Sequence, residues 1–200
     1  MNRFRLALGA ILLGASSVAV PVLATPAAAA TVDNSDPSHF IETLSGEAFR
    51  VLHTGSKGAA RGQFRQLLGQ YFAVDEIGDR LIRRWRPQIS DSQYQAYKAA
   101  LPGFIISTYA DRLYDYANAQ VKVVRAVPRG DGAAVMSQVV QPGQAPISAI
   151  WTVEKSGSGY KISNLTVANI NLVLTQTADF DSYVQKNGFD KLVAFIKSRS

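Results

Sequence analysis

The sequence predicts an α+β domain with N-terminal helices, a four-stranded antiparallel curved sheet and C-terminal helices. Two changes of pattern indicate this fold class. Apolar residues recur at helical spacing up to about Tyr116, alternate with a period of two between Val121 and Val167, and return to helical spacing after Asn169. Because a block of strands flanked by helices is typical of α+β domains, we expect the helices to cover one face of the sheet.

Residues 1–30 have the features of a secretory signal peptide. A short basic region precedes an apolar stretch that ends at Leu23, and Ala27–Ala30 supplies the small residues at which a signal peptidase cleaves. Gly, Ser and Pro interrupt this stretch, whereas a membrane-spanning helix needs ~20 solidly apolar residues. We expect cleavage after Ala30, a polar leader over 31–38, a single domain over 39–200 and a periplasmic location.

Composition excludes several classes of site. The chain contains no cysteine, which excludes disulfides and thiolate metal ligands. The formal net charge of +6 falls to +4 without the two arginines of the signal peptide, which is too weak to indicate a nucleic-acid-binding protein. His39 and His53 are separated by about four helical turns, or ~21 Å, and therefore do not share a metal ion. We expect no cofactor and no metal site.

The first half of the domain predicts three amphipathic helices. The first covers about residues 40–55, and a loop with the sequence GSKGAARG follows it. The second carries an apolar stripe over 64–72, and the third covers 74–85. Pro87 ends the third helix, because a proline ring does not fit the helical hydrogen-bond pattern.

A capping box predicts the start of a fourth, longer helix. Ser90 and Gln93 stand where a hydroxyl and an amide side chain satisfy the free backbone N–H groups of a helix start. Helical spacing then continues to about Tyr116. The side expected to be buried is rich in aromatic residues and consists of Tyr94, Tyr97, Leu101, Phe104, Ile105, Tyr109, Leu113 and Tyr116.

Four segments from Val121 onward predict strands: VKVVRAV, AAVMSQVV, ISAIWTVE and YKISNLTV. The connections PRGDG, QPGQAP and KSGSG have the length and the Gly and Pro content of hairpin turns. Successive hairpins form an antiparallel meander. Two short helices follow, separated at Asn187-Gly188.

Catalytic motifs are scarce in the sequence. No G-x-S-x-G motif occurs after the signal peptide, and no turn glycine lies between a strand and a helix, as a phosphate-binding loop requires. Asp111 and Asp115 lie at i, i+4 spacing and are the candidates for acid–base chemistry. One alternative is therefore a small α+β hydrolase or isomerase, which requires one of these carboxyl groups to be buried.

The stretch DRLIRRWRP concentrates positive charge around one tryptophan. It contains Arg80, Arg83, Arg84 and Arg86 next to Trp85. Helical spacing puts Trp85 on the apolar side, so the arginines occupy the face that a helix exposes to water anyway. The residue pattern alone leaves open whether this face is merely solvated or binds anionic lipid or a protein partner.

Several short motifs follow one another over the run FRQLLGQYFAVDEIGDRLIRRWRPQISDSQYQAYKAALPGFIISTYADRLYDY, and a G-F-D-x-L-V step follows at 188–193. In order and spacing they resemble the MlaC family of periplasmic phospholipid-shuttle proteins, also called the toluene-tolerance auxiliary component of an ABC transporter. The resemblance covers about residues 40–199. The matching positions in the first run are Asp75, Trp85-Arg86, Ser92-Gln93, Phe104, Tyr109-Ala110, Leu113 and Tyr116.

The resemblance implies a lipid carrier that is not an enzyme. Members hold acyl chains in an apolar cavity between sheet and helices. They pass phospholipid between an inner-membrane ABC transporter with MCE domains and an outer-membrane lipoprotein complex, which maintains outer-membrane lipid asymmetry. Arg80, Arg83, Arg84 and Arg86 then become candidates for partner docking. The residues expected to line the cavity are Phe72, Ile77, Leu81, Trp85, Leu101, Phe104, Ile105, Tyr109, Leu113, Val123, Met136, Ile150 and Ile162.

Three positions depart from the family pattern. Asn164 stands where the family usually has an acid, Asn169 replaces a glycine, and Asn171 replaces a serine. These changes leave the expected fold intact but bear on the ligand and the partners. A related branch is associated with hopanoid-producing bacteria, so a polycyclic lipid is an alternative cargo. A ligand-free adaptor whose apolar residues simply interdigitate is a further alternative.

Overall fold

The computed structural model describes residues 32–54, 57–114 and 116–200, without the side chains of 54, 57 and 110–113. The expected signal peptide and its cleavage site lie outside the described residues. No helix in the described ranges is long and apolar enough to cross a membrane. The helices are α1 (Pro37–Thr54), α2 (Lys57–Tyr71), α3 (Val74–Leu81), a 3-10 turn (Arg86–Gln88), α4 (Asp91–Tyr114), α5 (Leu172–Asn187) and α6 (Phe189–Ser198).

The sheet is an antiparallel meander whose strands lie side by side in chain order, which confirms the predicted α+β fold. It has one strand more than expected, because two residues after β4 fold back and pair with its end. Asn169 lies in the turn between them with a φ of 66°. Asparagine tolerates this left-handed region better than most residues do. The strands are β1 (Gln120–Arg129), β2 (Gly132–Val140), β3 (Ile147–Ser156), β4 (Gly159–Val167) and β5 (Ile170–Asn171).

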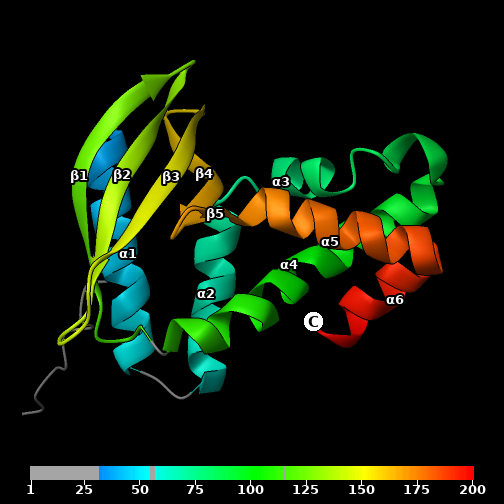
Figure 1. The fold of residues 1–200 in the computed structure, drawn as a ribbon, viewed down its shortest axis with the longest axis horizontal. Coiled ribbons are helices and arrows are strands. Elements are labelled where there is room, and N and C mark those ends of the chain that lie inside the picture. Colours follow the sequence, from blue (N-terminus) through cyan, green and yellow to red (C-terminus); the bar gives the residue numbers. More distant parts are fainter. Residues whose placement is uncertain (1–31, 55–56, 115) are drawn as a thin grey trace, which may run out of the picture.

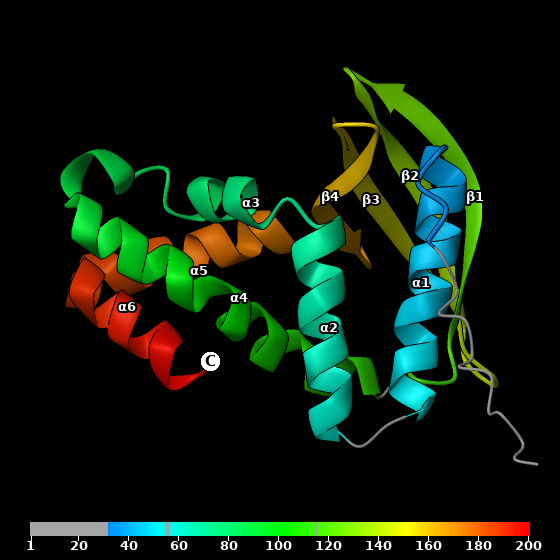
Figure 2. The ribbon, with the colours of Figure 1, turned by 180° about the vertical axis from the view of Figure 1, so that it is seen from behind.

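The helices do not all cover the sheet. Helix α1 packs against β1 and β2 and covers one face, which we call the inner face (Figure 2). Helices α3, α4, α5 and α6 form a lobe that extends away from the sheet on the side of β4 and β5 (Figure 1). The main partners of α4 are α6 and α2. The face of the sheet that the helices were expected to cover is therefore covered mainly by α1, whereas the long helix α4 packs within the lobe.

Two apolar cores hold these parts together. Burying one large apolar side chain stabilises a fold by about 1.5–3 kcal/mol, so each core is a major source of stability. The sheet core consists of Phe40, Ile41, Leu44, Ala133, Val135, Val153 and Ile162. The helical core consists of Ile77, Leu81, Ile82, Tyr97, Ala100, Leu101, Phe104, Phe180, Val184, Phe189, Leu192, Val193 and Ile196.

Two predicted helix boundaries are wrong. Helix α2 starts at Lys57, inside the segment expected to be a loop. Helix α3 ends at Leu81, four residues before the expected end at Trp85. From Ile82 the chain forms tight turns, in which the backbone N–H of Trp85 donates to the carbonyl of Ile82 at 2.8 Å. These turns let the Trp85 indole Nε1 donate to Asp181 of α5 at 2.7 Å.

Other local signals are confirmed. The backbone N–H of Ser90 donates to Gln93 Oε1 at 2.9 Å, and the backbone N–H of Gln93 donates to Ser90 Oγ at 3.2 Å. This reciprocal pair is the predicted capping box at the start of α4. The predicted break between the last two helices falls at Gly188, whose φ of 84° favours glycine.

Candidate functional site

The inner face of the sheet carries apolar side chains beyond those that α1 buries. Val121 and Val123 on β1 and Trp151 on β3 are only partly buried, and they pack against the edge of the sheet core. The Trp151 indole Nε1 donates to Ser137 Oγ at 2.9 Å, and Ser137 is itself buried. The polar atoms on this part of the inner face are therefore satisfied, which leaves a largely apolar surface.

Phe72 joins this surface to the helical lobe. It is partly buried and packs against the sheet core, the helical core and a small cluster of Leu68 and Ile106 between α2 and α4. The backbone fixes its position, because the N–H of Ala73 donates to the carbonyl of Ile162 at 2.9 Å. We call this region, where the inner face meets α2 and the helical lobe, the apolar junction.

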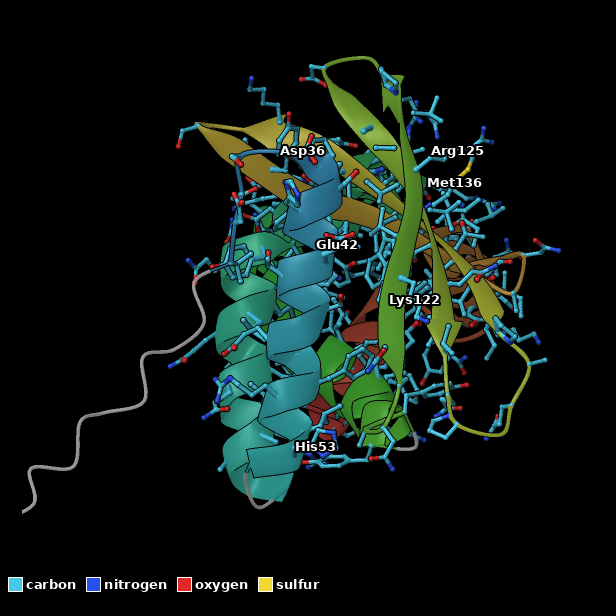
Figure 3. All side chains as sticks on the ribbon, turned by 90° about the vertical axis from the view of Figure 1, so that its left-hand side faces the viewer. Asp36, Glu42, His53, Lys122, Arg125 and Met136 are labelled. Carbon is cyan, nitrogen blue, oxygen red and sulfur yellow. The ribbon has the colours of Figure 1, made fainter. Side chains whose placement is uncertain are left out.

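A pocket of about 430 Å³ opens between the second half of α1 and the start of β1. Gly46 contributes to this space, because no atom lies within 4 Å of the position where a Cβ would stand. Figure 3 shows Glu42 and His53 along the same helix, beside β1. The pocket is lined by Glu42, Ser45, Gly46, Phe49, Arg50, His53, Ala119, Gln120 and Val121.

This pocket reaches the inner face through Val121 and has a charged rim. Arg50 at the rim pairs with the buried Glu47, with Nε 2.7 Å from Oε2. The sequence did not predict the pocket, because it depends on the angle at which α1 departs from β1. No local residue pattern reports that angle.

Many of the predicted lining residues belong to the helical core. Ile77, Leu81, Leu101 and Phe104 are all buried there. The Phe104 ring packs against Phe180, with ring centroids 5.6 Å apart. Trp85 and Ile105 lie at the margin of this core and are partly buried. These side chains pack mainly against one another, so the helical core is largely filled by protein.

The four predicted strand residues do not share a face. Val123 and Ile162 lie on the inner face. Met136 and Ile150 are cross-strand partners, and their neighbours in both strands lie on the inner face. Met136 and Ile150 therefore lie on the opposite face, where Ile150 is 36% exposed. Arg125 Nε lies 3.0 Å from Met136 Sδ, on the side of the strands away from α1 (Figure 3). The expectation that all four face the helices together is therefore wrong.

Some candidate residues cannot be placed by their side chains. Tyr109 is partly buried in α4, but the side chains of Asp111 and Leu113 and the whole of Asp115 lie outside the described residues. The acid–base hypothesis therefore stays a prediction. Within the described ranges, no group of three or more His, Asp or Glu side chains is placed to hold a metal ion.

The predicted arginines separate into two sets. Arg86 turns toward the start of α4, where its Nη2 donates to Asp91 Oδ1 at 2.9 Å and its guanidinium lies 4.2 Å from the centroid of the Tyr94 ring. The other three line a groove of about 650 Å³ between the end of α3 and the start of α5. This arginine groove is lined by Arg80, Arg83, Arg84, Asn164, Asn171, Val173, Leu174 and Thr177.

Acidic side chains compensate one end of the arginine groove. Arg80 Nη2 lies 3.4 Å from Glu154 Oε1. Partial burial, followed by a hydrogen bond to Glu154, raises the pKa of Glu76 above its usual value. Arg84 instead stacks on the neighbouring Trp85, with its guanidinium 5.0 Å from the ring centroid. The positive charge exposed to solvent therefore comes mainly from Arg83 and Arg84.

The sequence did not identify the other side of this groove. In the sequence Asn164 and Asn171 stand out only as departures from a family pattern, and Leu174 is one of several apolar residues after the last strand. In the structure Leu174 is 67% exposed. An exposed leucine in an otherwise amphipathic segment leaves no local signal, since its exposure depends on how α5 packs against α3 and β4.

The fold and the sites define an α+β protein whose curved sheet joins a helical lobe across an apolar junction, with a basic groove on its surface. A family model described as MlaC protein matches residues 42–198. The chain belongs to the MlaC family. A comparison with curated proteins finds no match.

A solved structure has the same fold. It is the phospholipid-binding protein from Ralstonia solanacearum, determined in complex with a phospholipid. The two chains are 22% identical in sequence and superpose with a TM-score of 0.69, and the match covers 82% of this chain and 96% of that chain. The similarity confirms the architecture of sheet and helical lobe.

Proposed function

We propose that this protein is a periplasmic lipid carrier that binds acyl chains at the apolar junction. In this proposal it is not an enzyme, and it passes phospholipid between an inner-membrane transporter and an outer-membrane complex. A hopanoid or another polycyclic lipid is the alternative cargo. Val121, Val123 and Trp151, together with Phe72 at the junction, would contact the chains.

One observation carries this proposal: the inner face of the sheet holds apolar side chains that the protein's own packing buries only partly. Membership in the MlaC family supports it. So does the presence of a phospholipid in the similar structure from Ralstonia solanacearum.

The energetics of acyl chains favour a carrier that depends on partners. Transfer of an acyl chain from water into an apolar site is favourable by about 0.8 kcal/mol per methylene. Two long chains would therefore leave the site very slowly by themselves. Release requires a membrane partner that loosens the junction, and the protein then needs surfaces on which such partners dock.

Native mass spectrometry tests the proposal directly. The protein would be expressed from its full gene, recovered from a bacterial periplasm without detergent, and measured beside a denatured sample. We expect the mass of the polypeptide plus one lipid, and the released mass distinguishes a phospholipid from a hopanoid. A bare polypeptide that also takes up no lipid from vesicles would contradict the carrier and favour the adaptor.

Two neighbouring valines offer a matched test of the position of the site. Val123 lies on the inner face, whereas a β-bulge between Val123 and Arg125 leaves Val124 62% exposed. We expect Val123→Asp to lower the bound lipid strongly, because an ionised carboxylate is costly to bury against acyl chains. Val124→Asp is the same change on the adjacent residue and should keep the full lipid load. Equal lipid loads in two folded variants would contradict this position.

A further inference from the structure

The arginine groove has two unlike walls. One wall is formed by the end of α3 and the turn after it, with Arg83 and Arg84 exposed. The other wall is formed by Asn164 of β4, Asn171 of β5 and the start of α5, where Leu174 is 67% exposed. Positive charge therefore faces an exposed apolar side chain across the groove.

The wall opposite the arginines also supplies directional hydrogen-bond donors. Asn164 Oδ1 accepts from the backbone N–H of Val173 at 3.4 Å, and Asn171 Oδ1 accepts from the backbone N–H of Leu174 at 3.0 Å. Because the carbonyl oxygens are used in this way, each amide presents its Nδ2 as the remaining donor. These bonds also fix Asn171 as the N-cap of α5.

The groove lies on the other side of the sheet from the proposed lipid site. Asn164 pairs with Thr152 in the register of β3 and β4, and the next pairs on either side are Trp151 with Leu165 and Val153 with Ile162. Trp151 and Ile162 belong to the inner face. Asn164 and Ile162 are two residues apart, but a register shift leaves Ser163 without a partner between them. Asn164 therefore alternates with its neighbour Leu165, which pairs with Trp151, and points to the outer face. A lipid held at the apolar junction therefore does not place its headgroup in this groove.

We propose that the arginine groove is a docking site for an acidic segment of a partner protein, with an apolar side chain next to its carboxylates. Arg83 and Arg84 would bind the carboxylates, Asn164 and Asn171 would donate to backbone carbonyls, and Leu174 would pack on the apolar side chain. This inference rests on the proposed function in one respect: a lipid carrier has a reason to dock, because it must reach its membrane complexes.

The chemistry of the groove favours a protein segment over a membrane surface. The groove is wide and open, with a volume of about 650 Å³, so its hydrogen-bonding groups make the distinction. Planar guanidinium groups bind carboxylates with two parallel hydrogen bonds, which fixes the direction of a docked chain. Amide donors beside them match the carbonyls that a peptide backbone offers at regular intervals.

A random peptide library identifies the ligand chemistry. Phage displaying random peptides of about 12 residues would be selected on the processed full protein and counter-selected on the Arg83→Gln/Arg84→Gln variant. We expect enrichment of Asp or Glu next to a large apolar residue. Enrichment without acids, or equal recovery on both proteins, would overturn the proposal.

Binding of a selected, labelled peptide then tests the individual walls of the groove. Fluorescence anisotropy should show at least about tenfold weaker binding for Arg83→Glu/Arg84→Glu, because charge reversal replaces attraction by repulsion. Asn164→Asp keeps the size of the side chain and its hydrogen bond to Val173, but it puts a carboxylate among the arginines. It should therefore also weaken binding, by a smaller factor.

A matched control distinguishes the effect of charges in the groove from the effect of the overall charge of the protein. Lys191→Glu/Lys197→Glu reverses two exposed charges on α6 and should leave the peptide affinity within about twofold of wild type. An equal loss in both double variants would overturn the proposal, and so would tight binding of phosphatidylglycerol vesicles through Arg83 and Arg84 with no peptide binding.

The lipid load distinguishes the failure of docking from the failure of the carrier function. Native mass spectrometry of Arg83→Glu/Arg84→Glu should show the same lipid content as wild type, because the groove lies on the other side of the sheet. A wild-type protein without lipid would contradict the proposed carrier function. The peptide measurements would then still decide whether the arginine groove is a docking site. Lost peptide binding together with lost lipid would overturn the separation of the two sites.

Discussion

A single amide side chain ties the segment before α1 to the sheet. Asn34 Nδ2 donates to the carbonyl of Tyr160 at 3.2 Å, and the backbone N–H of Tyr160 donates to Asn34 Oδ1 at 2.7 Å. The amide thereby takes the place of a neighbouring strand beside β4. Gly159 makes room for it, because a Cβ there would collide with the Asn34 side chain. The segment predicted as a polar leader is thus a structural anchor.

We expect Asn34→Ala to lower the free energy of unfolding by about 1–2 kcal/mol, because two hydrogen bonds across elements are lost. Urea denaturation measures this change. Asn187→Ala is the control: its Nδ2 donates to the Tyr183 carbonyl within α5, at 3.0 Å, and that bond links no second element. A loss at Asn34 no larger than the loss at Asn187 would show that the anchor contributes little.

Glu76 gives a prediction about pH. Partial desolvation of its carboxyl group, followed by the hydrogen bond to Glu154, raises the pKa of Glu76 in the folded state, although the side chain as a whole stays exposed. Its contribution to stability is therefore fully present below the unfolded pKa, near 4.5, and is lost as the pH rises through the higher folded pKa. Since Glu76 is exposed to solvent, screening keeps this contribution small.

We expect Glu76→Gln to increase the melting temperature relative to wild type more at pH 7 than at pH 4, because glutamine donates to Glu154 at both pH values. Glu42→Gln, an exposed change on α1, should show no such difference between the two pH values. Scanning calorimetry of both variants measures it. A gain for Glu76→Gln that is equal at both pH values would contradict the assigned carboxyl pair.

The side of the sheet on which a strand residue lies could be predicted only in part. Side chains alternate between the two faces along β2, but Val135 and Met136 are both apolar. The sequence therefore does not show whether the set with Val135 or the set with Met136 faces α1. The β-bulge between Val123 and Arg125 also puts two successive residues of β1 on the outer face. The burial of Val135 shows which phase faces the core.

At the scale of elements, a helix boundary was predictable where its cause is local. Ser90 and Gln93 are three residues apart and identified the start of α4 correctly. The early end of α3 instead accompanies a hydrogen bond from Trp85 to Asp181, 96 positions away. Such a distant contact leaves no pattern in the surrounding sequence. The same early end of α3 brings Arg83 and Arg84 together with Arg80 at one groove.

Two helical glycines are expected to change the free energy of unfolding in opposite directions when they are replaced by alanine. Gly62 lies inside α2, and no atom stands within 4 Å of its Cβ position. Gly78 lies in α3, where a Cβ would stand 2.7 Å from Leu101 Cδ2, and its carbonyl accepts from Tyr97 Oη at 3.0 Å. The first glycine weakens a helix without a packing reason, whereas the second permits the close approach of α3 to α4.

We expect Gly62→Ala to raise the free energy of unfolding by up to about 1 kcal/mol, because alanine favours the helix. Gly78→Ala should lower the same quantity by about 1–3 kcal/mol, because it overpacks a buried contact. Chemical denaturation measures both. A change of the same sign in both variants would contradict this assignment.

The stiffer α2 of Gly62→Ala should also slow lipid exchange with vesicles, because Phe72 directly follows this helix. Hydrogen exchange in α2 provides the link between the two effects. If lipid exchange slows while the protection of the α2 amides stays unchanged, the stiffness of the helix is not the cause.

At the scale of the whole molecule, the order of elements was predictable and their placement was not. The period of the apolar pattern predicts helices and strands one by one. Whether α1 or α4 covers the sheet depends on which apolar face fits it, and both helices present such faces. The structure assigns Phe40, Ile41 and Leu44 of α1 to the sheet and most apolar residues of α4 to the helical core. The molecule thus has two cores with a junction between them.

Phe72 and Phe104 distinguish the junction from the helical core. Of the described residues, only Phe72 packs against all three apolar clusters, and it remains partly buried. Phe104 is 6% exposed and packs within the helical core. If lipid binds at the junction, Phe72→Ala should lower the bound lipid strongly and the free energy of unfolding by about 2–3 kcal/mol.

Phe104→Ala should destabilise the fold at least as much, by about 3–5 kcal/mol, but a folded variant should keep its lipid. Phe104→Leu serves the same comparison if the alanine variant does not fold. Native mass spectrometry and calorimetry on the same samples compare lipid load and stability. A variant of Phe104 that is folded and lacks lipid, beside a Phe72→Ala variant that retains it, would move the lipid from the junction into the helical lobe. Such a result would mean that α4 opens away from α6, since their buried contacts leave no room for acyl chains in the packed state.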